Sequence, residues 1–406
     1  MPVLLILNQM AGPLTWQFAE DYARAVGPVA MLTGHPDTLA KGSRNDILLF
    51  PSAPHMKGSY PRRVVSWVRY CCHATCWLGR WPRKTPILVF SNPPILPWVA
   101  WLFRVLRGQR YAVMVHDIYP DILVRIGKLP EAHLVVLAWR ALNRRAYQRA
   151  DVVMTLGEHM ARRLRRCFDP AQTRHGRIEV VTPWADTNAI RPIPKQENWF
   201  AKKFEQLGKL TVMYSGNMGL SHDIEMMLLV AEQLRDNGGI HFMFIGSGPK
   251  WALVAETIEQ KGLNNVTVLP WQPEEVVPFS LPTADVAFIS LKEELTGMML
   301  PSKAFSFMAA GVPLLITSAM EGELADLVRH FSLGWNIRPG ETGAICALLQ
   351  QVRQPDILQP YRVASRRAAE KVGTRANSRG MTDLLSLAFK RDLGPADSRS
   401  RAQSQD

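Results

Sequence analysis

Short apolar runs alternate with longer amphipathic stretches along most of the chain. Twelve runs of four to six residues predict β-strands, and most of the stretches between them are long enough for a helix. Strands that alternate with helices are typical of parallel sheets with helical crossovers. The predicted strands are Val3–Leu7, Val29–Thr33, Ile47–Phe50, Ile87–Phe90, Tyr111–Val115, Val152–Thr155, Ile178–Val181, Leu210–Tyr214, Ile240–Ile245, Val266–Leu269, Val286–Ile289 and Pro313–Thr317.

A proline-rich segment at 192–198 divides these strands into a series of seven and a series of five. Two such series predict an α/β protein with two doubly wound, Rossmann-like domains. We place the first domain at residues 1–191, a linker at 192–208 and the second domain at 209–371. Ligands of such sheets bind at the carboxyl ends of the strands, so the expected site is the cleft where the domains face each other. The polar residues 392–406 are expected to be a disordered tail.

Length and composition narrow the class of protein. The 406 residues are enough for two domains, and no apolar run reaches the 18 or so residues that a membrane-spanning helix needs. Residues 1–7 read as a first strand rather than a signal peptide. The five cysteines show no paired framework, which favours a cytoplasmic location. The cluster at 71–76 crowds three cysteines and a histidine too closely for a zinc site, so no metal is expected.

Positive charge is concentrated in the N-terminal half of the chain. The net charge is +13, with 27 Lys/Arg against 13 Asp/Glu in residues 1–200 and 21 against 22 in residues 201–406. Residues 51–100 contain no acidic residue. This asymmetry predicts an anionic partner for the first domain, whether membrane, nucleic acid or phosphorylated substrate.

Two glycine-containing turns follow predicted strands in the second domain. The strand Leu210–Tyr214 runs into Ser-Gly-Asn-Met-Gly at 215–219, and an amphipathic helix is predicted to begin near Ser221. Gly216 and Gly219 would let the backbone approach a ligand, and a helix N-terminus attracts anions. The turn Gly-Ser-Gly-Pro at 246–249 repeats this chemistry. An ordinary strand–helix turn is the alternative interpretation of both.

Two further segments carry polar groups at expected strand or helix ends. In Pro301-Ser302-Lys303, the lysine is predicted in the first helical turn, where the helix dipole disfavours a cation unless an anion lies nearby. A solvated lysine is the alternative. His116-Asp117 follows a predicted strand, where α/β folds place reactive groups. A purely structural histidine is the alternative there.

Five short motifs, in this order, resemble one family. They are Asn-Pro-Pro at 92–94, Asp-x-Tyr-Pro-Asp at 117–121, Tyr-Ser-Gly-Asn-x-Gly at 214–219, Gly-x-Gly-Pro at 246–249, and Pro-Ser-Lys before an Ala-x-Gly-x-Pro turn at 301–313. Together they resemble the retaining glycosyltransferases of the GT-B fold, family 4, in the bacterial exopolysaccharide and colanic-acid branch. The resemblance also implies a last helix, at 372–391, that returns to the first domain.

The resemblance implies a donor site in the second domain for a nucleotide-diphosphate sugar, with UDP or GDP as nucleotide and no further cofactor. Because the chain contains no Asp-x-Asp, Lys303 and helix N-termini would stabilise the leaving diphosphate without metal. His116 would contact the transferring hexose, and Asp117 would orient His116 or the acceptor. The implied donor-binding residues are Gly216, Asn217, Gly219, His222, Ser247, Gly248, Ser302 and Ser306.

The chain departs from the family pattern at four positions. Asn217 and His222 stand where many members have Arg and Lys, which makes both weaker countercharges. Met298 and Ser306 stand where the family has a Glu-x7-Glu pair. A degenerate, non-catalytic GT-B protein that acts as a membrane-bound scaffold is therefore the alternative to an active hexosyltransferase.

Basic residues are interleaved with tryptophans at 57–110, a pattern that fits a membrane interface. Trp98 and Trp101 are expected to lie at this interface, with core tryptophans beside a solvated basic surface as the alternative. Arginines at 162, 163, 165 and 166 form another basic face. No nucleic-acid-binding motif occurs. We expect a peripheral protein on the cytoplasmic side of an anionic membrane, acting on a lipid-linked saccharide acceptor in bacterial surface polysaccharide synthesis.

Overall fold

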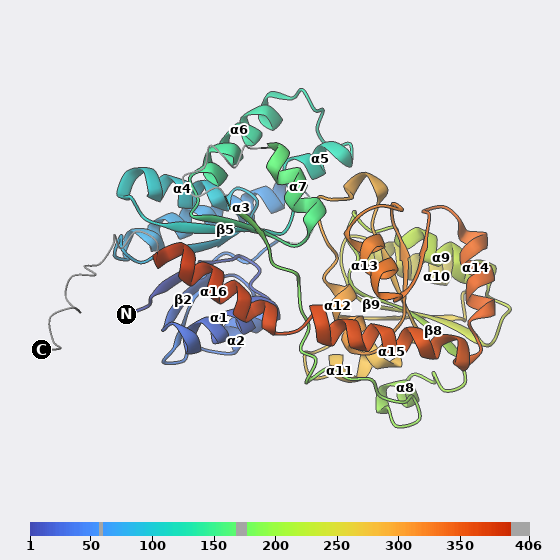
Figure 1. Ribbon diagram of the computed structural model, residues 1–406. Coiled ribbons are helices and arrows are strands. Elements are labelled where there is room, and N and C mark those ends of the chain that lie inside the picture. The colour runs from blue at the N-terminus through green and yellow to red at the C-terminus, as the bar shows by residue number, and fades with distance from the viewer. Residues whose placement is uncertain (57–59, 168–176, 391–406) are drawn as a thin grey trace, which may run out of the picture.

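The computed structural model describes residues 1–56, 60–167 and 177–390. It contains two separate parallel sheets, and Figure 1 shows them side by side, each covered by helices. The first sheet has seven strands in the order β3-β2-β1-β4-β5-β6-β7, and the second has six in the order β10-β9-β8-β11-β12-β13. The prediction of two doubly wound α/β domains is confirmed.

The first domain follows the predicted strands closely. Most of its strand residues are buried, as expected for a parallel sheet covered on both faces. In Figure 1, α3, α4 and α6 lie on one face, and α1, α2 and α16 lie on the other. The elements are β1 (Leu4–Leu7), α1 (Pro13–Ala25), β2 (Val29–Thr33), α2 (Pro36–Ala40), β3 (Ile47–Pro51), α3 (Tyr60–Gly79), β4 (Ile87–Phe90), α4 (Leu96–Arg107), β5 (Tyr111–Val115), α5 (Asp121–Arg125), α6 (Leu134–Gln148), β6 (Val152–Thr155), α7 (Glu158–Cys167) and β7 (Ile178–Val180).

The second domain has longer central strands, because β8 and β9 continue into the two glycine turns. One helix, α8, lies within the segment that we assigned as linker. The elements are α8 (Trp199–Lys203), β8 (Leu210–Asn217), α9 (Ile224–Gln233), β9 (Ile240–Ser247), α10 (Trp251–Lys261), β10 (Val266–Leu269), α11 (Val277–Ser280), the 3₁₀ helix Leu281–Thr283, β11 (Val286–Ser290), the 3₁₀ helix Glu293–Leu295, α12 (Lys303–Ala309), β12 (Leu314–Thr317), α13 (Glu323–Phe331), β13 (Gly334–Ile337), α14 (Thr342–Gln351), α15 (Pro355–Val372) and α16 (Ala376–Lys390).

Strand β13 is the one described strand that the apolar pattern missed. Its sequence is Gly-Trp-Asn-Ile, and all four residues are half-buried at the edge of the sheet, beside β12. An edge strand needs little apolar surface, so it leaves no run of aliphatic residues in the sequence.

Alternation along the strands divides the core of the second domain between two faces. Met213 on β8 belongs to a buried cluster that continues into the first domain, whereas its neighbours Val212 and Tyr214 belong to a separate cluster on the opposite face. Successive strand residues point to opposite faces, which explains the division. One face of the second domain therefore shares a hydrophobic core with the first.

The chain crosses back to the first domain between α15 and α16. Helix α16 packs along α1, and Arg375 at the crossing donates to both carboxylate oxygens of Asp21 at 3.0 and 2.9 Å. Arg110 reaches the last turn of α16 and donates to the carbonyl oxygens of Ala388 and Phe389. The predicted disordered tail lies outside the described residues.

Candidate active site

The two domains meet directly at the end of β5. The backbones of Asp117 and Met299 form an isolated antiparallel bridge, and the Ile118 N–H donates to the Met298 carbonyl at 2.9 Å. Because this contact is made by main-chain groups, it fixes the end of β5 against the segment that leads into α12. His116 is thereby placed opposite the start of α12.

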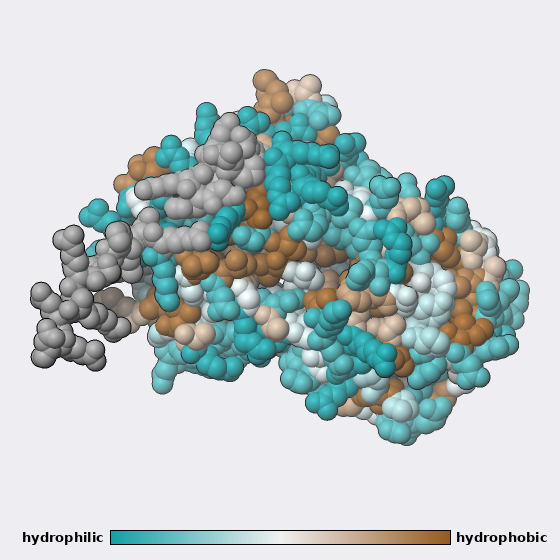
Figure 2. Space-filling model, viewed as in Figure 1, coloured by the Kyte–Doolittle hydropathy of each residue, from teal (hydrophilic) through white to brown (hydrophobic). Residues whose placement is uncertain are grey.

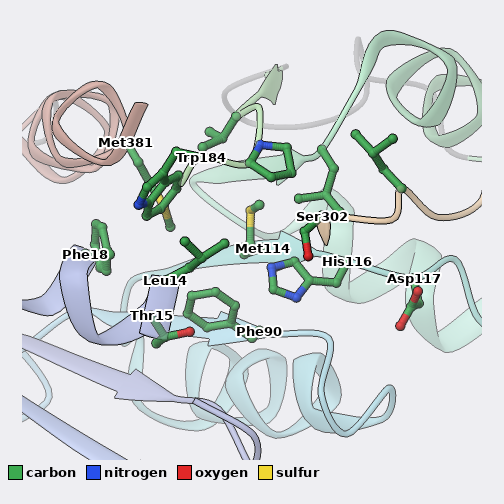
Figure 3. A pocket seen from close by; sticks show the side chains of 14 residues that line it. Leu14, Thr15, Phe18, Phe90, Met114, His116, Asp117, Trp184, Ser302 and Met381 are labelled. Atoms are coloured by element: carbon green, nitrogen blue, oxygen red, sulfur yellow. The ribbon is translucent and has the colours of Figure 1, made fainter. Parts of the chain in front are cut away.

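His116 lines a small, largely apolar cavity between the domains. The cavity has a volume of about 140 Å³, and Figure 3 shows the imidazole pointing toward Ser302, the residue before α12, and lying beside Phe90. The Phe90 and His116 rings meet edge to face at 5.3 Å between centroids. Burial lowers the pKa of His116 to about 4, so the ring is neutral near pH 7. A neutral imidazole can donate or accept a hydrogen bond but cannot neutralise a phosphate.

Asp117 follows His116 in the sequence and also lines the cavity, but its side chain does not contact the imidazole. Figure 3 shows the two side chains apart, and the described residues include no hydrogen bond between them. The expectation that Asp117 orients His116 through such a bond is therefore not supported. Burial raises the pKa of Asp117 to about 6, which leaves its carboxyl group available for proton exchange near neutral pH.

The two glycine turns lie against each other at the carboxyl ends of β8 and β9. A Cβ on Gly246 would lie 2.0 Å from the Gly216 carbonyl oxygen, and one on Gly248 would lie 2.8 Å from Asn217 Oδ1. Gly216, Gly246 and Gly248 also have φ values of 141°, 140° and 145°, which side chains rarely adopt. Only glycine fits these positions, because a side chain would meet the close packing and the positive φ values.

Lys303 is the first residue of α12, as predicted, and its ammonium group lies against the first glycine turn. Nζ is fully buried, yet it has no hydrogen-bond partner among the described residues. It lies 3.7 Å from the centroid of the Tyr214 ring and would be 3.3 Å from a Cβ on Gly216. Burial lowers the pKa of Lys303 well below its usual range. A buried ammonium without a carboxylate favours an anionic ligand at this turn.

Comparison with known families agrees with this geometry on both sides of the cleft. Residues 11–184 match the glycosyl transferase 4-like domain, and residues 209–354 match glycosyl transferases group 1. The chain belongs to the family 4 glycosyltransferases. These two matches cover the second sheet and all of the first sheet except β1.

Two curated relatives are named as glycosyltransferases. The probable glycosyltransferase WbjE of Pseudomonas aeruginosa is 27% identical over 275 residues, which are 68% of this chain and 68% of WbjE. The putative colanic acid biosynthesis glycosyl transferase WcaI of Escherichia coli (strain K12) is 29% identical over 293 residues, which are 68% of this chain and 67% of WcaI.

Solved structures confirm the GT-B fold. Sucrose-phosphate synthase from Thermosynechococcus elongatus matches with a TM-score of 0.73 at 15% identity, over 95% of this chain and 99% of that one. Anabaena HepE in complex with UDP-glucose matches with a TM-score of 0.70 at 14% identity, over the same shares.

The two residues that stand in place of the family's glutamates lie at the interdomain contact and on α12. Met298, which stands in place of the first glutamate, is buried, and its carbonyl accepts the interdomain hydrogen bond. Ser306, in place of the second, is half-buried on α12, three residues after Lys303. Residues three apart share a helix face, so Ser306 lies on the side of α12 that carries Lys303.

His222 does not supply the countercharge expected of it. Its ring is buried, its Nδ1 lies 2.6 Å from the Ser290 carbonyl oxygen, and burial together with nearby Lys303 lowers its pKa to about 3. The imidazole is therefore neutral, and Nδ1 donates to Ser290. Its place beside Lys303 leaves that lysine as the cation at the turn.

The predicted helix start near Ser221 is also displaced. Helix α9 begins at Ile224, and Asp223 caps it by accepting a hydrogen bond from the Met226 N–H. An anion approaching this helix would have to compete with the Asp223 carboxylate. The sequence analysis did not identify Lys250, whose buried Nζ donates to Glu225 at 2.6 Å. This bond links Lys250 to the first turn of α9. The position of Lys250 directly after the Gly-Ser-Gly-Pro turn was the available signal.

The tryptophans of the first domain are core residues rather than an interface. Trp67 and Trp77 are buried, and Trp98 and Trp101 are half-buried against the core. The prediction for Trp98 and Trp101 was wrong, because α4 turns both rings inward. The aliphatic residues that α3, α4 and α6 expose instead include Leu134 (80% exposed) and Leu106 (71% exposed), with Val64, Val65, Val68, Leu102, Val105, Val135 and Leu137.

These exposed aliphatic residues do not make α3, α4 or α6 a membrane span. Figure 2 shows hydrophobic surface near the apex of the first domain. No helix of the described chain combines the length and apolar character needed to cross a bilayer.

A basic groove lies beside the interdomain contact. It has a volume of about 440 Å³ and runs between α7 and the segment 296–297. Its cations are Arg162, Arg163 and Arg166, and the acidic residue in its lining is Glu321. Arg163 Nε is buried without a hydrogen-bond partner among the described residues. The predicted basic face of α7 thus forms part of a groove that adjoins the interdomain contact.

Proposed function

We propose that this chain transfers a hexose from a nucleotide-diphosphate sugar to a lipid-linked saccharide, with retention of configuration, in bacterial surface polysaccharide synthesis. The observation that carries the proposal is the buried Lys303 ammonium, which lies over the Gly216 turn without a carboxylate. A donor diphosphate is an anion of the required charge. The name of WcaI, a putative colanic acid biosynthesis enzyme, supports the polysaccharide assignment.

The donor diphosphate would occupy the space between the glycine turns and α12. Its charge grows as the glycosidic bond breaks, and a preorganised cation stabilises that charge without reorganisation. Lys303 would supply the cation, and the turn backbones at Gly216 and Gly248 would approach the phosphates closely. Asn217, Ser247, Ser302 and Ser306 would contribute neutral hydrogen bonds. We propose that no metal takes part.

The first domain would act on the sugar and not on the phosphates. A neutral His116 can hydrogen-bond a sugar hydroxyl from an apolar cavity, where such a bond is worth more than in water. Asp117, with its raised pKa, is suited to exchange a proton with an acceptor hydroxyl at near-neutral pH.

The acceptor would lie along the basic groove of α7. Three arginines suit the phosphate groups of a lipid carrier, since guanidinium binds phosphate through paired hydrogen bonds. The exposed aliphatic residues of α6 would face the membrane near the same end of the domain. Together these features support a peripheral location on the inner face of the cytoplasmic membrane.

A screen for nucleotide binding tests the donor assignment directly. We expect UDP or GDP to raise the melting temperature of the purified protein, because a ligand that binds the native state stabilises it. Lys303→Ala should weaken that binding about ten- to a hundredfold, since a charge-assisted hydrogen bond contributes roughly 1.5–3 kcal/mol. Lys371→Ala, which removes an exposed lysine of α15, is the matched control. Equal affinity in the Lys303 variant would exclude this lysine from the donor site.

Transfer by the purified protein separates an enzyme from the scaffold alternative. We expect release of nucleoside diphosphate from the binding donor when a lipid-linked saccharide is present. Donor binding without any release or transfer, over a panel of acceptors, would favour the non-catalytic protein.

Vesicle binding tests the location. The protein should co-sediment with vesicles that contain anionic lipid more than with neutral ones, because each Lys or Arg near an anionic surface contributes about 1 kcal/mol. Reversing the exposed charges at Arg80, Arg83 and Lys84 should release it into the supernatant. Equal binding to both vesicle types would exclude an electrostatic attachment.

A further inference from the structure

A second large cavity lies at the amino end of the C-terminal sheet, away from the glycine turns. It has a volume of about 810 Å³, and its walls are the linker residues 192–196, the starts of the central strands and one side of α15. The charged residues of its lining are strongly unbalanced. Asp285 is the one carboxylate, and the cations are Lys195, Lys209, Arg353, Arg362, Arg366 and Arg367.

Three of these cations already have partners that hold the cavity together. Lys195 and Arg362 both bind the Asp285 carboxylate. Arg366 pairs with Glu370 at 2.6 Å and donates to carbonyl oxygens of the linker approach and of α12. The linker, α12 and α15 are thus joined by arginine and lysine side chains along one wall.

The other three cations have no acidic partner within the described parts of the chain. Lys209 is half-buried, and Arg353 and Arg367 are exposed. The positive charge of the cavity also affects a nearby histidine. The pKa of His241 on β9 is lowered to about 4 by burial and then by Lys209 and Lys195. Since residues 201–406 as a whole carry 21 cations against 22 acids, the fold has gathered unneutralised positive charge at this cavity.

Gly239 makes room for the guanidinium group of Arg353 at the cavity. A Cβ on Gly239 would lie 2.2 Å from Nη2 of Arg353, so the guanidinium rests directly on the glycine at the edge of the cavity. A Cβ on the preceding residue, Gly238, would have no neighbouring atom within 4 Å. The close approach is therefore specific to position 239.

We propose that this cavity binds a small anion that carries two or more phosphate groups, at a site separate from the donor site. Guanidinium and ammonium groups on several walls suit phosphate oxygens presented in several directions. Leu210 at this cavity and Gly216 in the first glycine turn are six residues apart on β8, or roughly 20 Å at about 3.3 Å per residue. One ligand cannot fill both sites.

Occupancy of this site would act on the connection between the domains. The linker forms one wall and α15, which leads to the return crossing, forms another. A bound polyanion would neutralise the free cations and draw the two walls together. It should therefore raise the melting temperature of the whole protein.

Titration with tripolyphosphate, followed by calorimetry and thermal shift, tests the proposal. The Lys303→Ala variant serves as background, because it weakens any binding of tripolyphosphate at the donor turn. We expect saturable binding in this background. Combining Arg353→Glu with Arg367→Glu should weaken the binding at least tenfold, whereas Lys371→Glu, a charge reversal on α15 outside the cavity, should change it less than threefold.

A second pair of variants leaves the charge unchanged. Gly239→Ala should displace the Arg353 guanidinium and weaken tripolyphosphate binding several-fold, and Gly238→Ala should not. Binding that survives both Gly239→Ala and the double charge reversal, or that falls equally with Lys371→Glu, would overturn the site. Binding that disappears in the Lys303→Ala background would also overturn it, and would assign the anion to the donor turn instead. Failure of nucleotide binding would leave this test unaffected.

Discussion

Lys195 and Lys303 are buried at opposite ends of the C-terminal sheet, but only Lys195, at the amino end, has a carboxylate partner among the described residues. At the amino end, Lys195 is buried against Asp285 and three backbone or hydroxyl oxygens. At the carboxyl end, Lys303 is equally enclosed, but it meets an aromatic ring and a glycine. A cation that stabilises the fold comes with its own carboxylate, because an unpaired buried charge is costly. The difference indicates that the countercharge of Lys303 arrives with a ligand.

The largest expected effect is the loss of stability when a methyl group is added to a glycine turn at the carboxyl end of the sheet. Gly246→Ala would put a Cβ 2.0 Å from the Gly216 carbonyl oxygen, at a φ of 140°. The combined clash and backbone strain should cost roughly 3 kcal/mol or more of unfolding free energy. Gly238→Ala at the amino end, which meets no atom within 4 Å, should change it by less than about 1 kcal/mol. Chemical denaturation of both variants measures the contrast, and equal losses would contradict the close packing of the two turns.

The next contrast exchanges each buried lysine for methionine. Lys195→Met removes one of the two cations of Asp285 and should lower the unfolding free energy by roughly 1–3 kcal/mol, without changing nucleotide affinity. Lys303→Met removes a cation that has no carboxylate, so stability should hold or rise while nucleotide affinity falls about tenfold or more. Denaturation and nucleotide titration on the same samples give both readouts. A loss of stability at Lys303 as large as that at Lys195 would mean that Lys303 is a structural residue.

The third prediction concerns His116, which lies across the cleft at the carboxyl end of the first sheet. His116→Ala should lower the turnover number about tenfold, or roughly 1.4 kcal/mol, and leave nucleotide affinity unchanged, because the nucleotide contacts belong to the second domain. His116→Asn, which keeps a hydrogen-bonding group, should recover part of the rate. Should His116→Ala lower thermal stability while the folded fraction keeps full specific activity, the histidine has only a packing role.

The smallest expected effect is the uptake of protons at the carboxyl end. The pKa of Lys303 is lowered in the free protein by burial, and a bound diphosphate would raise it again. Nucleotide binding should therefore take up protons at pH values above the lowered pKa, and the uptake should vanish as the pH exceeds the usual lysine value of about 10.4. Calorimetry in buffers of different ionisation enthalpy detects it. The Lys303→Met variant should show less uptake, and an identical uptake would assign the proton to another group.

The sequence predicted the sheets well because their strands are short, buried and continuous in apolar character. Ten of the twelve predicted strands begin at the predicted residue, an eleventh begins at Leu4 instead of Val3, and β8 and β9 extend at their carboxyl ends into the glycine turns. The twelfth, predicted from Pro313, begins at Leu314 because proline has no N–H to donate to the ladder. Strand β13 was not predicted, because its half-exposed edge residues form no apolar run.

The site was predictable in outline and not in its electrostatics. Spacing placed Lys303 at a helix start and His116 at a strand end, since both follow from local sequence. Whether Lys303 has a carboxylate partner depends on which segments pack around it, and no local pattern records that. The neutral state of His222 depends in the same way on its burial and on Lys303, which lies far away in the sequence. Trp98 and Trp101 were misplaced because a basic, aromatic segment does not reveal which face of a helix is buried.

The main-chain bridge between the domains also has an evolutionary consequence. Asp117 and Met299 pair through their backbones, and Ile118 binds the carbonyl oxygen of Met298. These main-chain contacts therefore do not depend on the side chains at 298 and 299. A substitution at 298 or 299 would keep these main-chain bonds while changing the packing of a buried residue, whereas proline at 118 would remove the donor. The same main-chain contact would therefore hold the two domains together in a relative that carries another residue at 298.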